Sequence, residues 1–274
     1  MHKTFAAIVL FLLAIPFSVS AEDRVVCTIF REIGSSSNLV EEGQCDERYS
    51  SASTFKLAIS LMGFDSGILN SSDSPEWPFQ EDYYDWRPEW RKRTTPQSWL
   101  EHSVVWYSQQ ITQRLGAETF ANYVQKFDYG NEDVTGEEGY DGLTHAWLSM
   151  SLRISANEQI DFLTKMLEQK LPVSTFAVVQ TKTILKPQAQ PEGWVVYGKT
   201  GAGFPHGTDG KRQMDQRFGW YVGWAEKGSR TIVFAQLMRF DKPPEQPPGS
   251  VARNALMEVL FAGGGPLFQS QMGE

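Results

Sequence analysis

The chain has 274 residues, of which 41% are hydrophobic and 13% aromatic, so it can bury a full core as one large domain or as two interleaved lobes. Its formal net charge is -8 at pH 7. This acidity argues against nucleic acid or an anionic membrane as a partner, because both are negatively charged themselves.

The N-terminus has the three parts of a secretory signal peptide over residues 1–21. Lys3 gives the charged start, residues 5–17 form the apolar middle, and Val19-Ser20-Ala21 is a small-residue cleavage site. The apolar segment is too short to span a bilayer, and no later stretch reaches about 18 apolar residues. The sequence therefore predicts a secreted, periplasmic protein with a single domain over residues 22–274 and no membrane attachment after cleavage.

A β-hairpin is predicted next. Its strands are residues 25–30 and 39–42, and its turn is the Gly-, Ser- and Asn-containing stretch 34–38. Folding this hairpin brings Cys27 and Cys45 roughly opposite each other, and disulfides persist in exported proteins. A disulfide and two buried free thiols are both open at this point, because the bond depends on geometry.

The first helix is predicted from Ser53-Thr54-Phe55-Lys56 through the apolar run 57–62 to about Gly63. Ser53 and Lys56 are three residues apart, so on a helix they meet on one face. A serine hydroxyl needs an adjacent base to act as a nucleophile. Burial disfavours the charged form of a lysine and lowers its pKa, so Lys56 is suited to be that base.

The middle of the chain carries helical signals on both sides of an irregular segment. Residues 71–94 are rich in Pro, Trp, Tyr and charge without periodicity, which predicts a loop packed by its own aromatic residues, Trp77, Trp86 and Trp90. Another loop is predicted over the acidic and Gly-rich residues 128–142. Capping signals and apolar spacing predict a helix that begins at Thr95-Pro96 and further helices over residues 104–115, 117–127, 155–170 and 174–185.

Strand signals return beyond Pro191. They cover residues 194–199, 219–226 and 230–239, and a final helix is predicted over residues 250–261. Because strands from both ends of the chain can share one sheet, we expect an α+β fold, an antiparallel sheet flanked by helices with an inserted all-helical lobe. The sheet lobe would comprise residues 22–50 and 192–274, the helical lobe residues 51–191, and a cleft would lie where they meet.

Two further short motifs accompany Ser53 and Lys56. Ser103-Val104-Val105 falls at the start of a predicted helix, and Lys199-Thr200-Gly201 falls at the end of a predicted strand, followed by Ala202-Gly203. Small residues there let a ligand approach the strand backbone closely. Each string is common by chance, but the order Ser-x-x-Lys, Ser-x-Val and Lys-Thr-Gly is specific.

With these three motifs, and over nearly the whole mature chain, the sequence resembles the penicillin-interacting serine enzymes, and among them the class D (oxacillinase-type) serine β-lactamases. Class A enzymes carry Ser-Asp-Asn where this chain has Ser103-Val104-Val105. The resemblance implies the β-lactamase/transpeptidase-like fold and hydrolysis of the lactam amide of penicillins and related antibiotics. Further matching strings are Tyr129-Gly130-Asn131, Gly142-Leu143, Ala146-Trp147-Leu148, Gly219-Trp220 and Val222-Gly223.

The resemblance also implies catalytic roles. Ser53 would be the nucleophile that becomes acylated. Lys56 would react with carbon dioxide to give N6-carboxylysine, the general base of both half-reactions, and the indole N–H of Trp147 would hold this carbamate. Ser103 and Lys199 would pass a proton to the leaving lactam nitrogen. Carbon dioxide or bicarbonate is the only cofactor implied.

A second set of residues would bind the substrate. Backbone N–H groups of Ser53 and Ala202 would form the oxyanion hole. Arg253 on the final helix would be a second carboxylate anchor beside Lys199, because a guanidinium fork matches a carboxylate. The substrate-binding residues implied are Thr200, Gly201, Ala202, Arg253, Val105 and Leu148, of which the last two would form an apolar lid that controls water access.

Two other functions share the three motifs: a penicillin-binding transpeptidase or carboxypeptidase, and a β-lactam sensor domain that stays acylated. Trp147 and its neighbours favour the hydrolase. Metal chemistry is disfavoured, because His102, His145 and His206 lack ligand spacing. The motifs leave the substrate range (oxacillin, cephalosporin or carbapenem) and the oligomeric state open.

Overall fold

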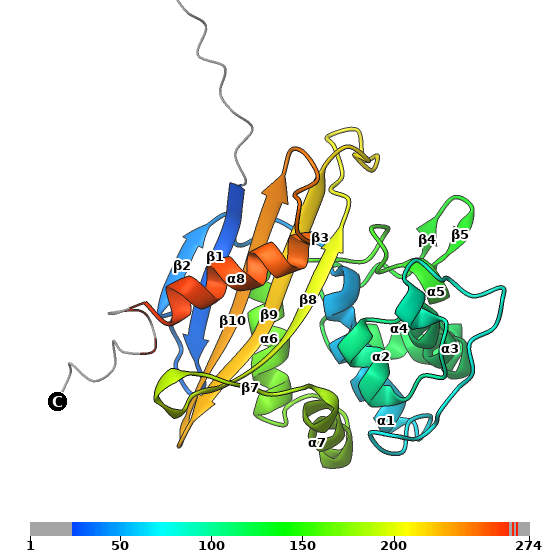
Figure 1. Cartoon of the computed structure of the whole chain (residues 1–274), viewed down its shortest axis with the longest axis horizontal. Helices are drawn as coiled ribbons and strands as arrows, with labels where there is room; N and C mark the ends of the chain where they lie inside the picture. The colour runs from blue at the N-terminus through cyan, green and yellow to red at the C-terminus, as the bar shows by residue number, and fades with distance from the viewer. Residues whose placement is uncertain (1–23, 263–264, 266, 268–274) are drawn as a thin grey trace, which may run out of the picture.

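The computed structural model describes residues 24–262, 265 and 267, so the predicted signal peptide lies outside the described residues. Its centre is a six-stranded antiparallel sheet in the order β2-β1-β10-β9-β8-β7. Strands from both ends of the chain share this sheet and helices flank it (Figure 1), which confirms the predicted fold class. The strands are β1 (Arg24–Glu32), β2 (Val40–Gly43), β7 (Gln188–Ala189), β8 (Val195–Gly203), β9 (Arg217–Lys227) and β10 (Arg230–Phe240).

The two faces of the sheet bury different side chains, because successive residues of a strand point to opposite sides. On β9, Trp220 and Trp224 belong to a large core shared with the helices, whereas Tyr221 belongs to a smaller core on the other face. α8 (Pro248–Leu260) covers this smaller core, and α6 (Ala156–Leu167) packs on the face of the large core (Figure 1).

The other helices gather beside β8 (Figure 1). Their centre is α1 (Lys56–Asp65), in which every residue from Lys56 to Phe64 is buried, as expected for a helix surrounded by other elements. The accompanying helices are η1 (Ala52–Phe55), η2 (Pro88–Trp90), α2 (Pro96–His102), α3 (Val105–Leu115), α4 (Ala117–Lys126), α5 (Gly142–His145) and α7 (Thr175–Ile184). A further short turn, η3 (Pro191–Gly193), connects β7 to β8. Two short ladders pair β3 (Tyr49–Ser50) with β6 (Arg153–Ile154) and β4 (Gly136–Glu137) with β5 (Tyr140–Asp141).

The capping signals in the sequence mark helix starts correctly. Thr95 caps α2, where its hydroxyl accepts a hydrogen bond from the Ser98 backbone N–H. Ser155 and Glu158 form the predicted capping box of α6, and Ser174 caps α7. These signals are reliable because each satisfies backbone N–H groups that the first turn of a helix leaves without partners.

Some elements differ from the prediction. α1 does not stop at Gly63 but continues to Asp65; a Cβ at Gly63 would lie 2.8 Å from the Leu69 side chain, so this glycine permits close packing. The segment 128–142, predicted as a loop, contains the β4–β5 hairpin. The residue range predicted as the helical lobe includes α6, which packs on β1 and β10.

β8 extends beyond the predicted end at Lys199. Its pairing with β9 runs through Thr200–Gly201 to Gly203, which pairs with Phe218. The hydrogen-bonded ladder thus holds a Gly-rich stretch of low strand propensity in extended form. The whole Lys-Thr-Gly motif therefore lies inside a strand, at a rigid position.

Cys27 and Cys45 form a disulfide that joins β1 to the segment after β2, with Cα atoms 4.9 Å apart. This answers the question that the sequence left open. Across residues 24–262, 265 and 267, no helix is both long and apolar enough to cross a membrane.

Candidate active site

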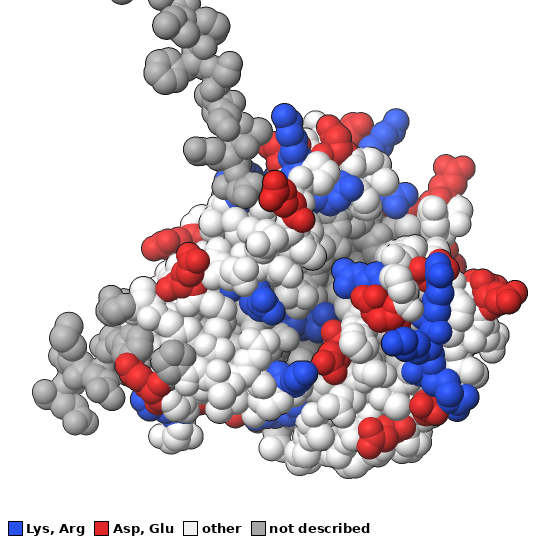
Figure 2. All heavy atoms as spheres, in the orientation of Figure 1, with Lys and Arg blue, Asp and Glu red and all other residues white. Residues whose placement is uncertain are grey.

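A cavity of about 560 Å³ lies where β8 faces the helices. In the space-filling view it is a hollow near the middle of the molecule, bordered by lysine and arginine side chains (Figure 2). The predicted residues that line it are Ser53, Ser103, Val105, Leu148, Lys199, Thr200, Gly201 and Ala202. Three sequence motifs separated by up to 150 positions thus meet at one cavity.

Ser53 and Lys56 form the inner end of the site. Ser53 lies in η1, a 3-10 turn that leads directly into α1, rather than in the first turn of an α-helix. The Lys56 Nζ donates a hydrogen bond of 3.2 Å to the Ser53 Oγ. The amine is close enough to take the serine proton, as the spacing predicted.

Lys56 is 0% exposed and has no carboxylate partner among the residues that the structure describes. Burial lowers its pKa well below the usual value, and the positive charges of Lys199 and Arg87 lower it further. Lys56 is therefore neutral in a pH range where an exposed lysine is charged. A neutral amine is both a proton acceptor and a nucleophile.

Trp147 belongs to the same buried region. It is 0% exposed, and its ring centroid lies 5.6 Å from that of Phe55, the residue before Lys56. The Trp147 Nε1 is buried without a hydrogen-bond partner. Leaving such a donor unsatisfied costs about 1–3 kcal/mol, so this N–H can stabilise an acceptor group placed beside it.

Ser103 and Lys199 form the second pair. The Lys199 Nζ donates hydrogen bonds of 3.1 Å to the Ser103 Oγ and to the Thr200 carbonyl oxygen. Ser103 does not begin a helix; it is the C-cap residue of α2, with a left-handed φ of 57°. Burial and the nearby Arg87 charge lower the pKa of Lys199 to about 7.

The strand β8 approaches Ser53 closely because of Gly201. A Cβ at this position would lie 3.1 Å from the Ser51 carbonyl oxygen and 3.1 Å from the Thr54 side chain. Trp220, which pairs with Gly201 in the ladder, donates its indole N–H to the Ser50 carbonyl oxygen at 3.0 Å. These contacts fix the distance between η1 and β8, and with it the position of Ser53 against the strand.

Arg253 is the predicted residue that the structure does not bring to the site. It lies on α8 with its Nη2 3.3 Å from the Asn254 Oδ1, and it is not part of the cavity wall. α8 contributes Gly249 and Ser250 to the wall instead. The prediction came from the family resemblance and the guanidinium chemistry, whereas the face of a helix that points to a cavity depends on tertiary packing.

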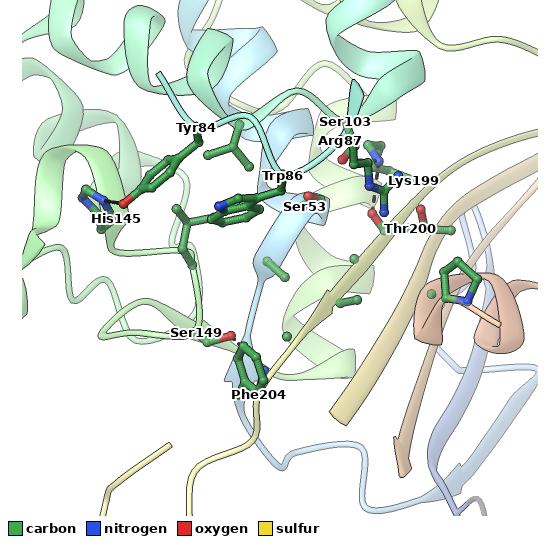
Figure 3. A pocket seen from close by; sticks show the side chains of 18 of the residues that line it. Ser53, Tyr84, Trp86, Arg87, Ser103, His145, Ser149, Lys199, Thr200 and Phe204 are labelled. Atoms are coloured by element: carbon green, nitrogen blue, oxygen red, sulfur yellow. Dashed lines mark hydrogen bonds between the residues drawn. The ribbon is translucent and has the colours of Figure 1, made fainter. Parts of the chain in front are cut away.

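The aromatic loop contributes residues that the sequence did not assign to the site. Tyr84, Trp86 and Arg87 line the cavity (Figure 3). Trp86 packs within the loop as predicted, with its ring 5.0 Å from that of Tyr84 and 5.6 Å from that of Trp90. It is also 61% exposed and lines the cavity, and the buried Trp90 is part of the same wall, which the sequence did not predict. No periodicity or motif marks this loop, so only the composition could have drawn attention to it.

Of the described residues, no three or more His, Cys, Asp or Glu side chains gather as a group that could hold a metal ion. The amine of Lys56 contacts Ser53, and the charged groups that act on this amine are the Lys199 ammonium and the Arg87 guanidinium. The arrangement can therefore deprotonate a serine hydroxyl, hold an anion and return a proton to a leaving group.

Comparison with known proteins places this chain in a family. The family model of the penicillin binding protein transpeptidase domain matches residues 29–260. β-Lactamase OXA-9 of Klebsiella pneumoniae is 43% identical over 254 residues, covering 90% of this chain and 92% of OXA-9. β-Lactamase OXA-1 of Escherichia coli is 37% identical over 203 residues, covering 72% of this chain and 69% of OXA-1.

A solved structure agrees with these relatives. The crystal structure of the class D β-lactamase OXA-427 matches with a TM-score of 0.81 and 43% identity, covering 85% of this chain and 96% of the matched chain. The chain therefore belongs to the class D serine β-lactamases.

Proposed function

We propose that this enzyme opens the lactam amide of penicillins and related antibiotics through an acyl-enzyme on Ser53, with Lys56 as the base. The observation that carries the proposal is a buried lysine amine without an ion pair, 3.2 Å from a serine hydroxyl at the floor of a cavity. Membership of the class D family supports it. β-Lactam resistance of the host follows from this activity.

In acylation, the Ser53 Oγ bonds to the lactam carbonyl carbon while its proton passes to the Lys56 side chain. The backbone N–H groups of Ser53 and Ala202 stabilise the oxyanion, an interaction worth about 3–4 kcal/mol per donor in other enzymes. The lactam C–N bond then breaks, and the nitrogen takes a proton from the Ser103 hydroxyl, which Lys199 replenishes. Thr200 and Lys199 hold the substrate carboxylate.

Before deacylation, the Lys56 side chain passes the proton that it took from Ser53 to the Ser103–Lys199 pair, which replaces the proton given to the lactam nitrogen. In deacylation, Lys56 is then free to accept a proton from a water molecule, whose oxygen attacks the ester carbon. The bond between that carbon and the Ser53 Oγ breaks, and the Oγ regains a proton from Lys56. Val105 and Leu148 are the apolar wall beside this path, so they restrict where water can reach the ester. The cycle leaves the enzyme unchanged and releases the ring-opened acid.

The residues around Lys56 fit a carbamate formed from carbon dioxide. Only an unprotonated amine adds carbon dioxide, and the lowered pKa of Lys56 provides one. A buried anion needs a hydrogen-bond donor, and the unpartnered Trp147 Nε1 lies in the same buried region. When bound, carbon dioxide supplies an anionic base in place of a neutral amine.

Steady-state hydrolysis of nitrocefin, measured with and without added bicarbonate, tests the proposal. We expect sustained turnover that rises with bicarbonate, and mass spectrometry should locate a transient acyl group on Ser53. A burst without steady turnover would point instead to a transpeptidase, a carboxypeptidase or a sensor domain. A Ser53→Ala variant that still turns over would contradict the role of Ser53.

We also propose that the mature enzyme is a single domain of residues 22–274 in the periplasm, reached by cleavage after Ala21. The support is the pattern of charge, apolar residues and small residues over residues 1–21. N-terminal sequencing of protein recovered from a periplasmic extract should begin at Glu22. Recovery with the membranes, or an uncleaved N-terminus, would contradict this.

A further inference from the structure

Arg87 occupies a fixed position at the rim of the cavity. It is the residue before η2, with extended backbone dihedrals, and its carbonyl oxygen accepts a 3.0 Å hydrogen bond from the Trp90 N–H. Trp90 is fixed through its side chain and its backbone. Its Nε1 donates a hydrogen bond of 2.9 Å to the His102 carbonyl oxygen, and its own carbonyl oxygen accepts one of 2.9 Å from the Trp106 Nε1. The loop therefore presents Arg87 from a buried anchor.

The Arg87 guanidinium has no ion-pair or hydrogen-bond partner within the part of the chain that the structure describes. Its neighbours on the same loop do have partners, because Arg91 pairs with Asp85 at 2.8 Å and Arg93 pairs with Glu76 at 2.6 Å. An unpaired cation is unexpected in a chain with a formal net charge of -8. The five N–H donors of the Arg87 guanidinium are therefore available to bind an anion.

The charges around Arg87 in the cavity favour an anionic ligand. Glu101 also lines the cavity, but Lys186 pairs with it at 3.1 Å. Arg212 is held by Glu137 at 3.4 Å. Lys199, by contrast, has only neutral partners. Two cations that pair with no carboxylate of the described residues, Arg87 and Lys199, thus remain at one end of the cavity, close to Ser103 and Thr200 (Figure 3).

The opposite end of the cavity is aromatic. Tyr84 and Trp86 lie on the other side of Ser53 from Lys199 (Figure 3), and Leu148 also lines the wall. Tyr84 is held by a 2.9 Å hydrogen bond between its hydroxyl and the His145 Nε2. The cavity therefore has a cationic end and an apolar end, and Ser53 lies between them.

α8 has no room for a second anchor at the place where it meets β8. A Cβ at Gly249 would lie 2.8 Å from the Gly201 carbonyl oxygen and 2.9 Å from the Thr200 Cβ. A long side chain cannot extend into the cavity from this position. The other α8 residue in the wall, Ser250, carries no charge, whereas the loop that carries Arg87 places a cation in the same cavity wall as Lys199 and Thr200.

We propose that Arg87 is the second anchor of the substrate carboxylate, in place of Arg253, and that it orients the substrate with its apolar side chain toward Tyr84 and Trp86. This inference rests on the proposed function. The guanidinium offers two parallel N–H donors to a carboxylate, which is stronger and more directional than a single ammonium contact. Arg87 is thus a specificity-determining residue that acts chiefly on substrate binding.

The test compares a penicillin with its methyl ester, which lacks the carboxylate charge. Wild-type enzyme should prefer the acid. Arg87→Ala should lower kcat/KM for the acid about 10- to 100-fold, mostly through KM, and should leave the ester nearly unchanged. Arg87→Lys, which keeps the charge but not the fork, should fall between the two. If Arg87 had a purely structural role, the Arg87→Ala variant would lose kcat/KM equally for the acid and for the ester.

Lys92→Ala is the matched control, because it removes one positive charge from an exposed position of the same loop. It should leave the acid-to-ester preference as in wild type, and so should Arg253→Ala. An unchanged preference in Arg87→Ala, or a lost preference in Arg253→Ala, would overturn the inference. Failure of the proposed function would be visible separately, as wild-type enzyme that does not turn over the acid. Arg87→Gln, which keeps the side-chain length, repeats the test if the alanine variant is unstable.

Discussion

The two lysines of the site share one type of environment but differ in their neighbours. Lys56 lies in α1 behind Ser53, in the region of Phe55 and Trp147, and among the described residues its side chain donates a hydrogen bond only to the Ser53 Oγ. Lys199 lies on β8 and donates to the Ser103 hydroxyl and a backbone carbonyl. Burial lowers the pKa of both amines. Burial therefore favours the neutral form of both lysines, whereas the groups that contact each amine determine its chemical role.

The inner amine has an apolar surround and one unpartnered donor, which suits a carbamate. The outer amine has acceptors, and with a pKa of about 7 it carries a proton in part of the enzyme at neutral pH. A carboxylate bound beside it would raise this pKa and keep the charge. The inner lysine therefore serves as the base, and the outer lysine serves as a proton carrier and anion binder.

The largest effect should come from removing either amine. Lys56→Ala should lower kcat for nitrocefin by about 10³-fold or more, because the base serves both half-reactions. Lys199→Ala should lower kcat/KM by about 10²-fold, largely through KM. Circular dichroism should show that both variants fold. A Lys56→Ala variant with near wild-type kcat would break the comparison.

A smaller effect should follow from removing the donor near Lys56. Trp147→Phe keeps most of the ring but loses the N–H, so kcat should fall about 10-fold, and added bicarbonate should restore part of it. Trp99→Phe is the matched control, because Trp99 is equally buried but its Nε1 already donates to the Ser108 Oγ at 2.9 Å. That variant should lose stability without any new dependence on bicarbonate. Bicarbonate that rescues both variants, or neither, would contradict the role of Trp147.

The pH dependence should separate the two lysines. Below its lowered pKa, Lys56 is protonated and cannot add carbon dioxide, so kcat should fall as the pH drops. Higher bicarbonate should move the midpoint of this acid limb to lower pH. Profiles from about pH 5 to about pH 9 at two bicarbonate concentrations measure this. If the fall of kcat at low pH did not respond to bicarbonate, the group that titrates would be one other than Lys56.

The smallest expected effect is on the free energy of unfolding. Replacing Lys56 should raise this stability, although it lowers the activity. The pKa of Lys56 is lower in the folded than in the unfolded chain, so between these two values the unfolded chain binds more protons and stability rises with pH. Without bicarbonate, Lys56→Met should be more stable at neutral pH by about 1 kcal/mol, or about 2–4 °C in Tm. The gain in the free energy of unfolding should shrink toward about pH 10, where the unfolded chain also loses this proton. A Lys56→Met variant that is less stable than wild type at every pH would show that the buried amine does not destabilise the folded enzyme.

Local signals explain what the sequence predicted well. The Ser53–Lys56 pair, the capping box of α6 and the hairpin strands depend on residues a few positions apart, and the structure contains all of them. The meeting of Ser103 with Lys199 spans 96 positions, and only the resemblance to a family brought them together in advance.

What could not be predicted depends on packing between distant segments. The extension of β8 through Gly201 comes from its ladder with β9, not from strand propensity. Arg253 lies outside the wall, whereas Gly249 and Ser250 of the same helix line it, and Gly249 lets α8 pack closely on β8. Arg87 and Trp86 lie in a loop without periodicity, and their place at the cavity results from the buried anchor at Trp90.

The most direct test of the contrast between the two lysines is ¹³C NMR of enzyme equilibrated with ¹³C-bicarbonate near pH 8. A single carbamate carbon resonance should appear, be absent from Lys56→Ala and remain in Lys199→Ala. No carbamate resonance in wild-type enzyme, or one that disappears with Lys199 and survives the loss of Lys56, would contradict the account.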